Sequence, residues 1–373
     1  MVKHLKYIDA LRGIAASWVV FFHIWNRYYP EMNTQNHAFY VPDVLQWNFV
    51  ISFLLFQYGY IGVTLFFVLS GFCIHLPQAK RYAQSGSDQL SIKDFGKRRF
   101  WRLYPAYWAS IVLSAVALGF YPLLLGILNH QPVNFAATMD LRGAFFNAFF
   151  LQQFAPDTLL FNGVYWTLLF EVQFYAFYPA LLWLIRRAGL KTVFCILLVA
   201  EVTTIFWAPP IKHVFFTRYY EWFLGLLAAE WYVSGRCPIS PILTAWAGIL
   251  AGIAVTLNPF LWSFRDVLLA TGFFGLLLHF VRVETNPAQE KALNFSKILD
   301  AFVPVGLFSY SLYLIHIPII DVIWTGFRLG VKYGWISANL SNVLSLISVP
   351  IAFFFAYNFY LVFEKPFLQT KKK

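Results

Sequence analysis

Two cationic side chains, Arg12 and His23, stand eleven residues apart in the otherwise apolar stretch "RGIAASWVVFFH". On an α-helix this spacing brings both onto one face, about 16 Å apart along the axis. A histidine, whose pKa is about 6.5, can take a proton from a hydroxyl at neutral pH. An arginine can bind phosphate oxygens. The pair therefore fits an extended phosphopantetheine arm with its phosphates near Arg12 and its acyl thioester at His23, and the small residues Ala16 and Val19 are expected to leave room between them.

The alternative is that Arg12 only reaches cytoplasmic headgroups while His23 lies at the outer interface, with no shared task. A second cationic group favours the first interpretation. In "KDFGKRRFWRLYPAYW" an expected loop gathers basic side chains just ahead of an apolar run, and the candidates for binding the phosphates of an acyl-CoA are Lys97, Arg98, Arg99 and Arg102. Such clusters also serve membrane topology or anionic lipid headgroups, which stays open here.

Glu171, Tyr175 and Tyr178 have the spacing of one helix face. A carboxylate at Glu171 could fix the tautomer of His23 and stabilise its imidazolium, as in catalytic triads. The two tyrosines could line a sugar site with rings and hydroxyls. The alternative for this face is ordinary aromatic packing.

His316 is a further candidate for substrate binding. It also has a structural interpretation, because the nearby Pro318 leaves a backbone carbonyl free in the helix that His316 could satisfy. The eight histidines are scattered, so we expect no metal site. No nucleophile elbow surrounds Ser70 in "LSGF", which argues against a serine hydrolase.

Apolar helices must position these residues, because 60% of the chain is hydrophobic and only 12% is charged. The 373 residues predict an all-α integral membrane protein, a single polytopic domain over 1–373 without a separate soluble domain. The stretch Leu141 to Phe154 is expected to form an interfacial or re-entrant helix. We place ten spans, at 8–27, 50–76, 101–126, 164–186, 191–208, 215–234, 240–257, 264–282, 302–324 and 340–363.

The positive charges indicate how these spans are oriented. With a cytoplasmic amino terminus, inner loops and helix ends hold 21 of the 28 lysines and arginines, which places both termini in the cytoplasm. The outer side keeps Arg27, Arg142, Lys212, Arg218, Arg265, Arg328 and Lys332. The net charge of +11 is then a topology signal, and we expect no nucleic-acid partner.

Six stretches in order resemble membrane acyltransferase family 3, whose members O-acylate bacterial surface glycans. They are "YIDALRGIAASWVVFFH", "GYIGVTLFFVLSGFCI", "RRFWRLYPAYW", "YWTLLFEVQFYAFYP", "SYSLYLIHIPI" and "FEKP". The resemblance implies that Arg12 and His23 are needed for activity, with His23 as the catalytic base. It also implies that Ser70 and the arginines Arg99 and Arg102 serve the acyl donor, acetyl-CoA or another acyl-CoA. Many relatives carry a second acidic residue where this chain has Val172, so any acidic role here falls on Glu171.

The resulting hypothesis is an O-acyltransferase in the bacterial inner membrane, acting as a multi-pass protein within the lipid bilayer. It would move an acyl group, acetyl by preference, from cytoplasmic acyl-CoA to a hydroxyl of a glycan or glycolipid at the outer face. A transporter or glycan flippase is the alternative, with the buried charges as a substrate or proton path. Against that alternative, the sequence shows no internal symmetry and no paired broken helices. Neither the acceptor nor the oligomeric state can be predicted from the residues.

Overall fold

The computed structural model describes residues 5–28, 59, 61–86, 89–129, 141–151, 162–206, 218–256, 261–286, 296–337, 340 and 344–368. All regular secondary structure in these ranges is helical, as expected from the composition. Six helical stretches are long and apolar enough to cross a membrane: Lys6–Arg27, Ile61–Ser85, Tyr165–Ala188, Trp262–Thr285, Ser309–Lys332 and Ser348–Leu368.

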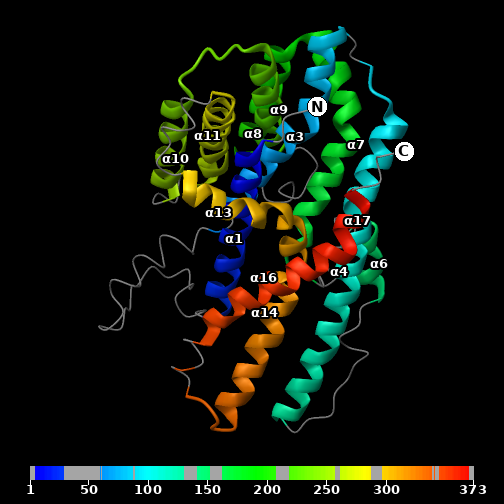
Figure 1. Ribbon diagram of the computed structural model, residues 1–373, viewed down its shortest axis with the longest axis vertical. Helices are drawn as coiled ribbons and strands as arrows, with labels where there is room; N and C mark the ends of the chain where they lie inside the picture. The colour runs from blue at the N-terminus through cyan, green and yellow to red at the C-terminus, as the bar shows by residue number, and fades with distance from the viewer. Residues whose placement is uncertain are drawn as a thin grey trace. The chain divides into compact units, whose positions relative to one another are not determined.

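Figure 1 labels the α-helices. In chain order, with the three short segments η4, η5 and η6 included, the helices are α1 (Lys6–Tyr28), α3 (Ile61–Ser85), α4 (Ile92–Asn129), α6 (Leu141–Ala148), α7 (Tyr165–Ala188), α8 (Leu190–Phe206), α9 (Tyr219–Ser234), α10 (Pro241–Thr256), η4 (Trp262–Phe264), α11 (Arg265–Thr285), α13 (Ser296–Leu307), α14 (Ser309–Lys332), η5 (Ser345–Ile347), α16 (Ser348–Phe359), η6 (Tyr360–Glu364) and α17 (Lys365–Leu368).

Helices occupy the described parts of the expected spans, with two corrections to the predicted boundaries. Parts of the spans expected at 50–76, 191–208, 215–234, 240–257 and 340–363 lie outside the described residues, and the count of ten stays a prediction. The span expected at 302–324 is two helices, because Phe308 leaves helical geometry (φ −113°, ψ 17°) between α13 and α14. The basic stretch expected as a loop before 101 is already helical, since α4 begins at Ile92. Its start is capped by the Ser91 hydroxyl, which accepts the Asp94 N–H at 3.3 Å and satisfies one of the free donors of the first turn. The short α6 lies within the expected interfacial helix and ends at Ala148.

The chain forms two compact units. The first comprises Met1–Ala15, Ile61–Lys97 and Leu169–Leu307, and the second comprises Ala16–Tyr60, Arg98–Leu168 and Phe308–Lys373. Helices α1, α4 and α7 each contribute residues to both units.

Glycines allow α3 and α9 of the first unit to touch backbone to backbone. A Cβ on Gly71 would lie 1.9 Å from the carbonyl oxygen of Trp222, and a Cβ on Gly225 would lie 1.9 Å from that of Val68. The same kind of contact joins α10 and α11, which run side by side in Figure 1. Without a hydrophobic effect between helices in lipid, such close packing of small residues is a main source of helix association.

The first half of α1 is fixed within the first unit in two ways. A Cβ on Gly13 would lie 2.2 Å from the Phe302 carbonyl oxygen of α13, so this contact requires the glycine of the "RG" pair. At the amino end of α1, the buried carboxylate of Glu284 accepts the backbone N–H groups of Lys6 and Tyr7 at 2.6 and 3.2 Å. An anion there also complements the helix dipole.

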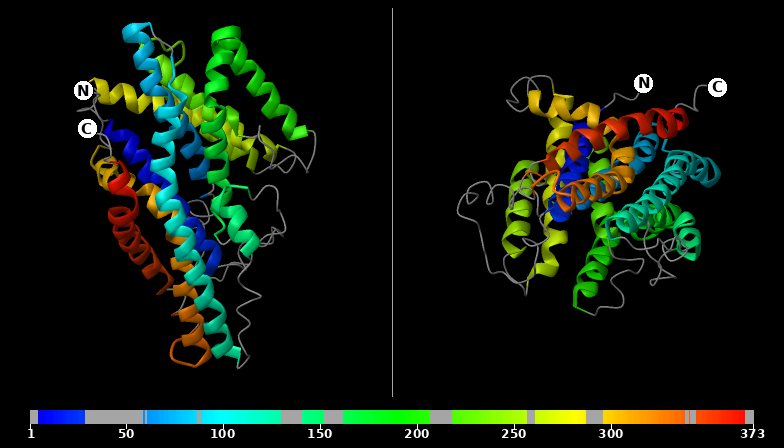
Figure 2. Two further views of the ribbon diagram at one scale, coloured as in Figure 1. Left: turned by 90° about the vertical axis from the view of Figure 1, so that its right-hand side faces the viewer. Right: turned by 90° about the horizontal axis from the view of Figure 1, so that it is seen from below.

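In the second unit α14 packs against α16, and α4 runs as one long helix that Figure 2 shows from the side. The chain after α16 makes a π-helical turn at Tyr360–Glu364. That turn brings the buried Glu364 to the first turn of α14, where its carboxylate accepts the Ser311 N–H at 3.2 Å and the Ser311 hydroxyl at 2.6 Å. Both units therefore use a buried carboxylate from elsewhere in the chain to cap a helix.

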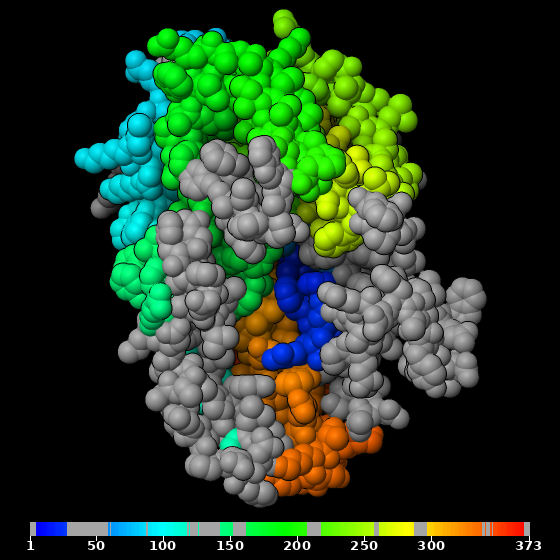
Figure 3. All heavy atoms as spheres, turned by 180° about the vertical axis from the view of Figure 1, so that it is seen from behind, coloured from blue at the N-terminus to red at the C-terminus, as the bar shows by residue number. Residues whose placement is uncertain are grey.

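Apolar side chains also cover outer surfaces of the helices. On α8 they include Ile196, Val199 and Phe206, which are 49%, 64% and 74% exposed. The green surface in the space-filling view of Figure 3 belongs to this part of the chain, α7 and α8. Side chains of this kind, exposed on long apolar helices, are suited to contact with lipid.

Candidate functional site

Two histidines meet in the second unit, His23 from α1 and His316 from α14. The Nε2 atom of His316 lies 3.1 Å from Nδ1 of His23, and the ring centroids are 5.0 Å apart. His316 is fully buried, whereas His23 is partly exposed. The pair therefore has one inaccessible member and one partly exposed member.

The backbone carbonyls around the pair assign its protons. Nδ1 of His316 lies 2.9 Å from the carbonyl oxygen of Leu312, and Nδ1 of His23 lies 2.9 Å from that of Val19. A carbonyl can only accept, so each neutral ring carries its proton on Nδ1. His316 then presents the lone pair of Nε2 to the Nδ1–H of His23, a proton shared between this nitrogen and the Val19 carbonyl oxygen. The lone pair of His23 is left on Nε2, the form that a general base requires.

The predicted structural role of His316 toward a free carbonyl is not what the structure shows. Pro318 has no N–H to donate to the Leu314 carbonyl one turn earlier. Asn162 fills the gap, because its side-chain amide donates to Leu314 O at 2.7 Å. The Nδ1 of His316 instead lies 2.9 Å from Leu312 O, so its Nε2 is the ring nitrogen that contacts His23.

Arg12 belongs to a different cluster, in the first unit. Its guanidinium forms an ion pair with Asp9 at 3.5 Å and lies within electrostatic range of the Glu171 carboxylate. The Arg12 side chain is 20% exposed. A phosphate at Arg12 would therefore join a site that already holds carboxylates.

Glu171 is the acceptor at the centre of this cluster. One of its oxygens, Oε1, accepts hydrogen bonds from the Ser70 hydroxyl at 3.4 Å and from the Tyr175 hydroxyl. Ser70, Glu171 and Tyr175 are all partly exposed. The structure thus brings together Arg12 and Ser70, both expected to serve the acyl donor, with Glu171, expected to assist the base, and Tyr175, expected to bind the sugar.

Tyr178, the third residue of the predicted α7 face, belongs to a deeper network. Its hydroxyl lies 2.9 Å from Nδ1 of His75, and Nε2 of His75 lies 2.6 Å from Glu230 Oε1. Tyr178 is 1% exposed, so it does not present its ring to a sugar. The burial of Tyr178 therefore does not fit a substrate-binding ring, whereas Tyr175 is partly exposed and donates its hydroxyl to Glu171.

The basic residues considered for donor binding lie on the first turns of α4. Lys97 is exposed, and Arg98, Arg99 and Arg102 are half-buried. Because they are helical, their side chains project at fixed angles along α4 rather than from a loop. Ala16 and Val19, in contrast, are each 1% exposed, so the expected open channel along α1 is wrong at these two positions.

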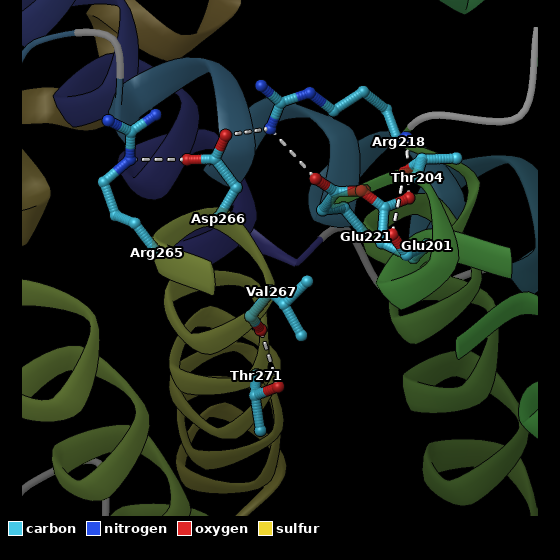
Figure 4. Close-up of polar contacts among 8 residues, drawn as sticks. All are labelled: Glu201, Thr204, Arg218, Glu221, Arg265, Asp266, Val267 and Thr271. Carbon is cyan, nitrogen blue, oxygen red and sulfur yellow. Dashed lines mark hydrogen bonds and ion pairs between the residues drawn. The ribbon is translucent and has the colours of Figure 1, made fainter. Parts of the chain in front are cut away.

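An ionic cluster of the first unit joins α8, the start of α9 and α11, and Figure 4 shows it. Arg218 Nη1 is 3.0 Å from Glu221 and 2.6 Å from Asp266, and Asp266 also pairs with Arg265 at 2.8 Å. Glu201 accepts the Arg218 backbone N–H at 3.1 Å. These contacts hold Arg218 in a left-handed conformation, φ 82°, just before α9. Glu221 and Asp266 thus both pair with arginines.

Several of these contacts could not be found from the sequence. The His75–Glu230 bond and the capping carboxylates Glu284 and Glu364 join residues that are far apart in the chain. A charged or polar residue in an apolar helix is costly unless it has a partner. The sequence therefore predicts that such residues have partners, but it does not identify them. Among the described residues, no group of three His, Cys, Asp or Glu side chains could hold a metal ion.

Comparison with known proteins identifies the class. Residues 5–361 match the acyltransferase domain profile of type 3, which covers nearly the whole chain. The chain belongs to this family of acyltransferases. No solved structure matches it significantly.

Individual relatives are distant. The chain is 27% identical to the peptidoglycan O-acetyltransferase OatA of Listeria monocytogenes over 352 residues, covering 86% of this chain and 50% of the relative. It is 27% identical to the exopolysaccharide production protein ExoZ of Rhizobium meliloti, covering 84% and 91%. The O-acetyltransferase OatA of Staphylococcus aureus matches 70% of the chain and 46% of its own length at 27% identity. The chain thus spans about half the length of the two OatA relatives.

Proposed function

We propose that the protein is an O-acetyltransferase that moves an acetyl group from cytoplasmic acetyl-CoA to a hydroxyl of an envelope glycan. The observation that carries the proposal is the His23–His316 pair, in which a buried histidine holds the ring of a partly exposed one. The names of the relatives, a peptidoglycan O-acetyltransferase and an exopolysaccharide production protein, support a glycan acceptor.

His23 acts as the general base in this proposal. The acceptor hydroxyl gives its proton to Nε2 of His23 as its oxygen attacks the thioester carbonyl. A C–O bond forms, the C–S bond breaks, and CoA leaves as a thiolate that the proton later neutralises. His316 positions the base, because its Nε2 accepts the Nδ1–H of His23 in both the neutral and the protonated ring. Such a base typically contributes about 10² to 10⁴ in rate.

The acyl donor is assigned to the residues that the family resemblance associates with it. Arg12 and Ser70 sit in one cluster with Glu171, and half-buried arginines of α4 supply forks for phosphates. Lys97, Arg98, Arg99 and Arg102 take the nucleotide phosphates in this account. Glu171, which accepts hydrogen bonds from Ser70 and Tyr175, is our candidate for a catalytic carboxylate in this donor cluster.

The proposed topology has ten membrane spans in one polytopic domain of the inner membrane, with both termini in the cytoplasm. The excess of Lys and Arg in the expected inner loops supports it. This orientation gives the basic start of α4 access to cytoplasmic CoA. It also directs His23, near the far end of α1, toward an acceptor outside.

The test uses the purified protein with radiolabelled acetyl-CoA and an envelope glycan preparation from its host. We expect label to appear on the glycan as an alkali-labile ester, and this label to be absent with His23→Ala. Arg99→Gln and Arg102→Gln should raise the KM for acetyl-CoA, whereas Glu171→Gln should lower kcat. Failure of acetyl-CoA to bind would overturn the enzymatic proposal. Transfer that survives His23→Ala but is lost with Glu171→Ala would overturn the assignment of the base.

A further inference from the structure

The arginines on the expected outer side are unusual, because the positive-inside bias leaves few cations there. Most of those that the structure describes have a carboxylate partner. Arg218 and Arg265 pair with Asp266. Arg27 of α1 pairs with Asp321 of α14 at 2.6 Å.

Arg328 of α14 is different. It is exposed, and among the described residues it has no carboxylate partner; its guanidinium lies 4.7 Å from the ring centre of Trp324. The guanidinium of Arg27 lies 4.4 Å from the same ring. Trp324 therefore holds two arginines, and only one of them is neutralised. The group formed by Arg27, Asp321, Trp324 and Arg328 carries a surplus of one positive charge.

This arginine–tryptophan group adjoins the His23–His316 pair on the same two helices of the second unit. On α1, Arg27 follows His23 by one turn, and on α14, Asp321 and Arg328 follow His316 by five and twelve residues. A molecule whose hydroxyl lies at His23 and which extends along these helices would reach Arg328 about 18 Å from His316.

Two orphaned polar atoms lie at the same end of α1. Within the described part of the chain, the buried Nε of Arg27 and the buried Oδ1 of Asn26 have no hydrogen-bond partner. One is a donor and the other an acceptor. Hydroxyl groups both donate and accept, so a sugar could satisfy both atoms. Buried polar atoms in native proteins are almost always satisfied, by protein, water or ligand.

We infer that the arginine–tryptophan group is the acceptor-binding site and that it selects a glycan carrying an anionic sugar, with Arg328 binding its carboxylate or phosphate. The inference rests on the proposed function and specifies in addition that the glycan acceptor is negatively charged. A neutral sugar would leave the surplus charge of Arg328 without a counterion, whereas an oxyanion supplies one in a charge-assisted bond. Lipid headgroups could also supply an anion, but the continuity with His23 and the orphaned atoms favours the acceptor.

The test measures the initial rate of radiolabelled acetyl transfer to acidic and neutral glycan fractions, separated from the host envelope by anion exchange. We expect label in the acidic fraction. Arg328→Gln should lower that rate about 5- to 10-fold at low salt, a loss of about 1 to 1.4 kcal/mol in transition-state binding. Arg328→Lys should keep at least a third of the rate. Arg142→Gln is the matched control, because Arg142 also stands over an aromatic ring, Phe146, but belongs to α6, which carries neither histidine of the pair.

Chemical neutralisation of the acceptor separates the possible anions. Carbodiimide reduction removes carboxylates and dephosphorylation removes phosphates; the treatment that brings wild type and Arg328→Gln within twofold of each other identifies the bound group. An Arg328→Gln defect that persists on both treated glycans overturns the inference. Label confined to the neutral fraction also overturns it. So does an Arg328→Gln defect that, with the protein in nanodiscs, depends on the fraction of anionic lipid and not on the charge of the acceptor. Absence of His23-dependent label from every fraction would instead overturn the proposed function, and the inference with it.

Discussion

The contact between α3 and α9 makes a quantitative prediction for Gly71→Ala. The added Cβ would lie 1.9 Å from the Trp222 carbonyl oxygen, whereas ordinary van der Waals contact begins at 3.4 Å. The two helices must therefore separate by roughly 1.5 Å, the difference between these distances, and the reciprocal contact at Gly225 is lost as well. Overpacking of this kind costs about 1 to 3 kcal/mol.

The free energy of unfolding is measured by reversible unfolding in mixed micelles. The acetyl-transfer activity of the folded protein is then measured separately. We expect a loss of about 1 to 3 kcal/mol in the free energy of unfolding. Activity should fall too, because α3 carries Ser70 and the Ser70–Glu171 bond is already long at 3.4 Å. Gly326→Ala is the control, since a Cβ there has no neighbour within 4 Å. Equal stability of the Gly71→Ala and Gly326→Ala proteins would refute the packing described here.

Three further predictions follow from single contacts. Glu284→Gln should lower the free energy of unfolding by about 1 to 3 kcal/mol, because the N–H groups at the start of α1 lose a charged acceptor; an unchanged denaturation midpoint would contradict this. Asn162→Ala should cost about 1 to 3 kcal/mol by leaving the Leu314 carbonyl unsatisfied, measured in the same unfolding assay, and no loss would mean that another donor serves this carbonyl. His316→Leu should lower kcat with little change in the KM for acetyl-CoA, and His316→Gln should restore part of the rate because its amide oxygen can accept from His23; equal rates for the two variants would argue against a positioning role.

The helices could be predicted well from the sequence because hydrophobicity along the chain is a local property. The same pattern could not show the break at Phe308, where the apolar run continues through the end of α13. It also could not show that α4 starts at Ile92, although Ser91 and Asp94 carry the spacing of a helix cap. In both cases the residues that set the helix boundary give a weaker sequence signal than the charged or apolar residues around them.

The candidate site could be predicted only as a set of residues, because partners depend on packing between distant helices. His23 was found from its position in an apolar helix, but its partner His316 comes from 293 residues away. Glu171, expected to assist His23, receives hydrogen bonds from Ser70 and Tyr175 within the first unit. Tyr178 has helical spacing with Tyr175, yet it faces His75, and nothing in the local sequence separates the two tyrosines.

The most direct test of the central claim is the single-turnover rate of acetyl transfer from bound, radiolabelled acetyl-CoA to the glycan by His23→Gln. The glutamine fills much of the same space but cannot take up the proton. We predict a rate at least about 100-fold below wild type, the contribution of a general base, with an unchanged Kd for acetyl-CoA. A rate within twofold of wild type would contradict the assignment of His23 as the base.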